Sequence, residues 1–72
     1  MKRVRLTAPL DLTSERAARG LIRSHGLLNI GALALWRDAG WRVVIDTAKP
    51  DTVRKYLAEH MPGIEWTQGE IT

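Results

Sequence analysis

The feature that most constrains the fold is the stretch 33–46, LALWRDAGWRVVID, in which two largely apolar runs flank the turn-forming residues Asp-Ala-Gly. Apolar residues that recur at every second position are typical of a strand with one buried face. A three-residue turn in which Gly40 takes the left-handed conformation would join the two runs as a hairpin. This turn predicts that Arg37 pairs with Trp41.

That register decides which side chains share a face, because a shift of one residue moves every side chain to the other side of the sheet. The residues expected on the core face are Leu33, Leu35, Val43 and Ile45. The residues expected on the opposite face are Ala34, Trp36, Arg42, Val44 and Asp46.

The same stretch has a second interpretation. Residues 32–39 contain strong helix formers and no β-branched residue, and Gly40 could end a helix there. The element order would then be β-α-α-β-α-β with three strands. The facing of Leu33 and Leu35 with Val43 and Ile45 favours the hairpin.

The rest of the chain alternates between strand and helix patterns. We expect strands over residues 2–7, 29–36 and 41–47 and a last strand over 64–67, before a frayed end at 69–72. The first helix is expected to be capped by Thr13 or Ser14 and to end at Gly26. The second helix is expected over 50–60, beginning at Pro50. The order β-α-β-β-α-β in one domain, residues 1–72, predicts a ferredoxin-like α+β sandwich. Its four-stranded antiparallel sheet would carry two helices on one face. The expected core residues are Leu21, Ile22, Leu33, Val43, Ile45, Leu57 and Trp66.

Length, charge and cysteine content narrow the function classes. A chain of 72 residues without cysteine forms one small core and has no disulfide or thiolate metal site. No signal peptide or membrane-spanning segment is apparent, so we expect a cytoplasmic protein with no membrane partner. Residues 1–37 hold seven Lys and Arg and two acidic residues, whereas the second half is acidic. A basic half of this kind favours an acidic partner.

Catalytic and metal-binding patterns are absent from the sequence. The two histidines, His25 and His60, end helices that should run antiparallel, which would put them at opposite ends of the domain. Ser14 has no base beside it, and Ser24 is adjacent to His25, but neighbouring residues of a helix point in different directions. No phosphate-binding loop occurs. We therefore expect no enzyme activity, no metal and no cofactor.

Two groups of residues are candidates for partner binding. Arg16, Arg19 and Arg23 follow a spacing that places them on one stripe of a helix. The open face of the sheet would carry Arg3, Arg5, Arg42 and Trp36, a combination suited to stacking on nucleic acid or to gripping a protein. A homodimer would pair two such open faces.

These observations predict a non-enzymatic protein-binding module, an accessory or inhibitor protein acting through an arginine-rich surface on an acidic protein. In size, and in the lack of cysteine and of any motif, the chain is similar to accessory proteins of phages and mobile elements, anti-CRISPR proteins among them. The alternative is a nucleic-acid-binding domain that uses the basic helix or the open face.

Overall fold

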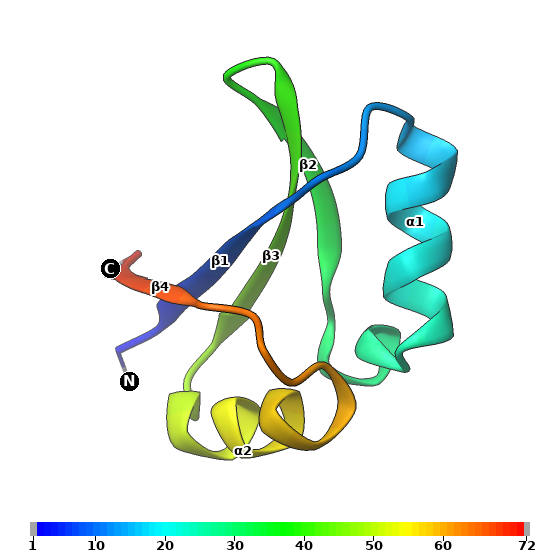
Figure 1. The fold of residues 1–72 in the computed structure, drawn as a ribbon. Helices are drawn as coiled ribbons and strands as arrows, with labels where there is room; N and C mark the ends of the chain where they lie inside the picture. The colour runs from blue at the N-terminus through cyan, green and yellow to red at the C-terminus, as the bar shows by residue number, and fades with distance from the viewer. Residues whose placement is uncertain (1, 72) are drawn as a thin grey trace.

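The computed structural model describes residues 2–71. Its elements in chain order are β1 (Val4–Leu10), α1 (Glu15–Ser24), the 3-10 turn η1 (Leu27–Ile30), β2 (Leu33–Arg37), β3 (Gly40–Thr47), α2 (Pro50–His60) and β4 (Thr67–Glu70). The strands form one antiparallel sheet in the order β2-β3-β1-β4 (Figure 1). The predicted α+β fold with the order β-α-β-β-α-β is confirmed, and it is consistent with a ferredoxin-like arrangement. The three-strand alternative is wrong, because the stretch before Gly40 is a strand.

The core lies on one side of the sheet, enclosed by the sheet and the two helices. Helix α1 runs along this face, whereas α2 lies across the end of the sheet away from the β2–β3 turn (Figure 1). The largest fully buried side chains are Leu6, Ile22, Leu27, Val43, Ile45 and Leu57. Of the predicted core, Ile22, Val43, Ile45 and Leu57 are confirmed, and Leu21 and Trp66 are half-buried.

Local signals explain where the helices begin and end. Ser14 caps α1, since its hydroxyl accepts a hydrogen bond from the N–H of Ala17 at 3.3 Å. Gly26 follows α1 with φ 69°, the left-handed conformation that ends many helices, and Leu27 after it is buried. Pro50 opens α2, where its missing N–H has no helical partner to lose.

The predicted hairpin register is wrong by one residue. The turn has two residues, Asp38 at φ 53° and Ala39 at φ 61°, and Gly40 belongs to β3 without a positive φ. Arg37 therefore pairs with Gly40, and Trp36 pairs with Trp41. A two-residue turn with both central residues left-handed matches the natural twist of a hairpin. The Asp-Ala-Gly sequence fits either turn, and the choice between them shifts the whole of β2.

The shift reverses the faces of β2. Leu33 and Leu35 lie on the open face, where Leu33 is 68% exposed instead of buried. Ala34 and Trp36 lie on the helix side, so the prediction that Trp36 shares the open face with Arg42 is wrong.

The two helix C-termini also meet, which contradicts the expectation that His25 and His60 lie far apart. A ring nitrogen of His25, Nδ1, lies 3.1 Å from the carbonyl oxygen of His60. The hydroxyl of Tyr56 donates to the carbonyl of Gly26 at 2.7 Å, and the Tyr56 and His60 rings stack at 3.9 Å. The reason is the tilt of α2: it crosses the end of the sheet instead of lying beside α1 (Figure 1).

The same tilt moves the last strand. The chain leaves α2 at the far end of the sheet and must travel back before it can pair with β1 (Figure 1). Residues 64–66 make this connection, with Ile64 and Trp66 packed against the core, and β4 pairs at 67–70. The predicted strand over 64–67 and the predicted fraying from Gly69 to Glu70 are therefore wrong, and Thr72 lies outside the described residues.

Candidate functional site

The predicted binding residues fall on separate surfaces. Arg3, Arg5 and Arg42 lie on the open face, as expected from strand alternation. Arg16, Arg19 and Arg23 lie on α1 and form what we call the α1 stripe. Trp36 joins neither group. It is 50% exposed on the helix side of β2 and meets Trp41 edge to face, with ring centroids 5.4 Å apart.

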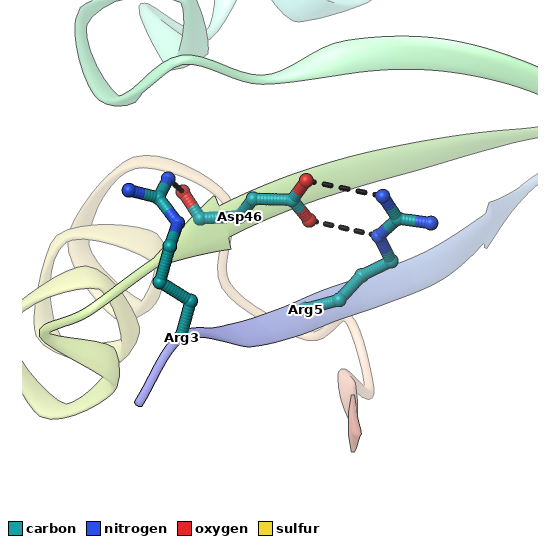
Figure 2. Close-up of polar contacts among 3 residues, drawn as sticks. All are labelled: Arg3, Arg5 and Asp46. Atoms are coloured by element: carbon teal, nitrogen blue, oxygen red, sulfur yellow. Dashed lines mark hydrogen bonds and ion pairs between the residues drawn. The ribbon is translucent and has the colours of Figure 1, made fainter. Parts of the chain in front are cut away.

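The open-face arginines are engaged within the chain. Arg5 makes a two-pronged contact with the carboxylate of Asp46, with Nε to Oδ1 at 2.8 Å and Nη2 to Oδ2 at 3.1 Å (Figure 2). Arg3 donates to the backbone carbonyl of Asp46 at 3.2 Å (Figure 2). The hydrogen bond from Arg5 lowers the pKa of Asp46. The Nη2 atom of Arg42 lies 4.0 Å from Oδ2 of Asp38.

This arrangement alters the electrostatics expected of the open face. Much of its positive charge is matched by Asp46 and Asp38. Within residues 2–71, the open-face positions of the strands hold no aromatic side chain, so bases have no ring to stack on there. The Arg and Trp stacking surface expected from the sequence does not form.

The α1 stripe differs from the open face. Arg19 pairs with Glu15 at 2.7 Å, but Arg16 and Arg23 make no ion pair or hydrogen bond among the described residues. The stripe borders a shallow hollow of about 400 Å³ above Gly20, whose missing side chain leaves the space open. Two unmatched guanidinium groups beside an open hollow can bind a carboxylate or a phosphate.

Sequence reasoning missed an apolar surface on β2. Four large apolar side chains are exposed between residues 28 and 36: Leu28 (56%), Leu33 (68%), Leu35 (40%) and Trp36 (50%). We call these four residues, with the outer backbone of β2, the β2 edge. Large exposed apolar side chains gathered in one place mark interaction surfaces. Assigning Leu33 and Leu35 to the core face concealed the patch.

Hollows flank the β2 edge on both sides. On the open face, a hollow of about 340 Å³ runs between Leu33, Leu35 and the Arg5–Asp46 pair. On the helix side, a hollow of about 200 Å³ lies between Leu28 and the side chains of Arg19 and Arg23. Residues of the α1 stripe and of the β2 edge therefore line the same hollow, so the two surfaces are continuous.

The backbone of β2 also has unused hydrogen-bonding groups. The residues next to a two-residue turn form a hydrogen-bonded pair, and bonded and non-bonded pairs alternate from there. Counting from Arg37, this alternation points the N–H and C=O groups of Ala34 and Trp36 away from β3. An edge strand of this kind can accept a further strand.

No constellation for metal chemistry occurs in the part of the chain that the structure describes: residues 2–71 contain no group of three or more His, Cys, Asp or Glu able to hold an ion. The contacts of His25, Tyr56 and His60 tie the helix ends together. Among the same residues, no helix is long and apolar enough to cross a membrane.

Comparisons with protein-family models, with curated proteins and with solved structures find no significant match to this chain.

Proposed function

We propose that this chain is a non-enzymatic protein-binding domain, of the accessory or inhibitor kind, that acts in the cytoplasm without a cofactor. Its α1 stripe, Arg16, Arg19 and Arg23, would grip an acidic surface on the partner protein. The observation that carries this proposal is the hollow that Arg19 and Arg23 share with exposed Leu28 and Leu33. Arginines that border an apolar centre are typical of protein interfaces.

A nucleic-acid partner is the alternative, and the distribution of charge supports it less well. Binding along a phosphate backbone needs a continuous run of free cations. On the open face, Arg5 is instead paired with Asp46 and Arg42 lies near Asp38, and on α1 Arg19 is paired with Glu15. Leu28, Leu33 and Leu35 add apolar surface that phosphates do not use.

The test is capture from cells of the source organism on the immobilised chain, with mass spectrometry of what binds. The first variant reverses the stripe to Glu at Arg16, Arg19 and Arg23. The matched control reverses Lys49, Arg54 and Lys55, which changes the net charge equally on and beside α2. We expect the stripe variant to lose the partner protein and the control to retain it, with both variants folded by circular dichroism.

Nuclease treatment of the lysate separates the two classes of partner. We expect the captured protein to stay bound after treatment. Release by nuclease, or equal capture by the stripe variant and the wild type, would overturn the proposal. The first of these results would favour the nucleic-acid alternative.

A further inference from the structure

We propose that the β2 edge pairs with the β2 edge of a second copy of this chain. The two strands would run antiparallel around a two-fold axis at Ala34, joining two four-stranded sheets into one continuous sheet. Closed two-fold pairing places the same patch against itself, so the patch must be self-complementary. The order of residues along β2 meets this condition.

On the open face, the axis at Ala34 sets Leu33 of one copy opposite Leu35 of the other, and the two-fold repeats this contact. These leucines are 68% and 40% exposed in the single chain. Directly opposed side chains in an antiparallel pair approach closely, with Cβ atoms about 4.5–5.5 Å apart. The pairing would therefore gather four leucines into one apolar cluster.

On the helix side, the same axis sets Trp36 of one copy opposite Ala32 of the other. Ala32 and Ala34 are small and line the hollow beside Leu28. The Trp36 ring, 50% exposed in the single chain, would enter this hollow and cover Leu28. Arg19 and Arg23 border the same hollow, so the Trp36 ring would lie where an arginine side chain can make a cation–π contact with its face.

Other registers fit the patch less well. An axis at Leu35 would place Leu33 opposite the charged Arg37 and move Trp36 away from Leu28. An axis at Trp36 would place Leu35 opposite Arg37. The axis at Ala34 covers all four exposed apolar side chains of the β2 edge.

The backbone agrees with this register. Ala34 of each copy can donate its N–H to the other's carbonyl, because both groups point outward. Trp36 can donate its N–H to the carbonyl of Ala32 in the other copy. Ala32 already donates its own N–H to Leu27 at 3.2 Å, so only its carbonyl is available.

The charges around the contact between the two β2 edges predict how the dissociation constant of the dimer depends on salt. Each copy brings Arg19 and Arg23 to the border of the apolar contact, and the two sets repel each other. Salt screens this repulsion, so the dimer should become tighter as salt rises. Binding of an acidic partner to the α1 stripe should weaken under the same change.

In the dimer, Trp36 of the second copy would close the hollow and take the place of Leu28 and Leu33 as the apolar surface beside Arg19 and Arg23, so the partner surface would contain residues from both chains. This role rests on the proposed function. Formation of the dimer does not, and it is tested without the partner.

The first experiment is sedimentation velocity across a wide range of protein concentrations, at low and at high salt. We expect a monomer–dimer equilibrium that shifts toward dimer with salt. Leu33→Lys should raise the dissociation constant by about tenfold or more, which corresponds to about 1.4 kcal/mol or more. Ile71→Lys is the matched control, because Ile71 is 41% exposed beside the opposite edge strand, and it should leave the equilibrium unchanged.

The second experiment fixes the register with single cysteines, since the chain has none of its own. In the proposed pairing, the two Ala34 Cα atoms would lie about 5.5 Å apart, within the range of about 4.4–6.8 Å that a disulfide spans. Ala34→Cys should therefore oxidise to a covalent dimer. Leu35→Cys and Trp36→Cys should not, because their counterparts would lie about 8 Å and about 14 Å away.

The outcomes are distinct. A salt-strengthened dimer with selective cross-linking at Ala34→Cys supports the proposal. Preferred cross-linking at Leu35→Cys or Trp36→Cys would overturn the register. A wild-type chain that stays monomeric throughout, with no selective cross-link, would overturn the dimer and leave partner capture by the α1 stripe unaffected.

Discussion

The two edges of the sheet present very different surfaces to solvent. The β4 edge is short and polar, reading TQGE, and Lys2 pairs with Glu70 there at 3.7 Å. The β2 edge reads LALWR and exposes Leu33, Leu35 and Trp36. Short strands and charges discourage pairing with another chain, whereas an apolar edge invites it. One edge therefore resists association, and the other is suited to it.

The largest expected difference in the free energy of unfolding is between a substitution inside the sheet and one at the β2 edge. Ile45→Ala removes fully buried side-chain volume and should lower the free energy of unfolding by about 2–5 kcal/mol. Leu33→Ala removes an exposed side chain and should change it by less than about 0.5 kcal/mol. Urea unfolding at a concentration that keeps the chain monomeric measures both. Equal losses would mean that Leu33 is buried in the single chain.

Amide hydrogen exchange compares the edges directly. Ile71 donates its N–H to Arg3, so by alternation the amides of Gln68 and Glu70 point outward from β4. We expect protection at Ala34 to rise about fivefold when the total protein concentration is about ten times the dimer dissociation constant, because about one fifth of the chains are then still monomeric. Protection at Gln68 and Glu70 should not change. A parallel rise at both edges would show that β4 also associates.

The turn decides which side chains β2 exposes, and it can be tested by two substitutions. Ala39 has φ 61°, which disfavours a side chain, so Ala39→Gly should raise the free energy of unfolding by about 1 kcal/mol. A methyl group added at Gly40 would meet only the carbonyl oxygen of Arg37, at 4.0 Å. Gly40→Ala should therefore change stability by less than about 0.5 kcal/mol. A large loss at Gly40 without a gain at Ala39 would restore the three-residue turn.

The smallest effect concerns acid stability at the Arg5–Asp46 pair, which joins the two central strands between the edges. Arg5 lowers the pKa of Asp46 in the folded chain, so the carboxylate stabilises the fold above its unfolded pKa of about 3.9. That contribution is lost as the pH falls through the folded pKa. Asp46→Asn should be slightly less stable than wild type at pH 7, and the difference should shrink below about pH 4. Urea midpoints across this range test it, and a constant difference would argue against the ion pair.

The sequence alone was sufficient for the order of elements and for much of the core. Periodicity identified the buried faces of β3 and α1, and Ser14, Gly26 and Pro50 marked helix boundaries. Register was harder to predict, because Asp-Ala-Gly is compatible with turns of two or three residues. The small side chains of Ala32 and Ala34, which can lie under α1, were the available signal for the correct facing.

The candidate site was predictable only in part. Helical spacing identified the α1 stripe, and strand alternation placed Arg3, Arg5 and Arg42 together. The contact of Arg5 with Asp46 depends on the β1–β3 register, which joins residues far apart in the chain. The β2 edge was hidden by the one-residue shift, and the tilt of α2 that brings His25 near His60 arises from tertiary packing.

The place of β1 at the centre of the sheet has a consequence for how the chain reaches its native state. β1 pairs with β3 from the middle of the chain and with β4 from its last residues, joining Val4 to Glu70. Closing such long loops opposes folding entropically before the contacts they bring can form, so chains of this topology fold more slowly than helical bundles. The β2–β3 hairpin, whose contacts are local, can form first. It would then present its apolar edge while β1 is still unpaired, and early association is most probable in that interval.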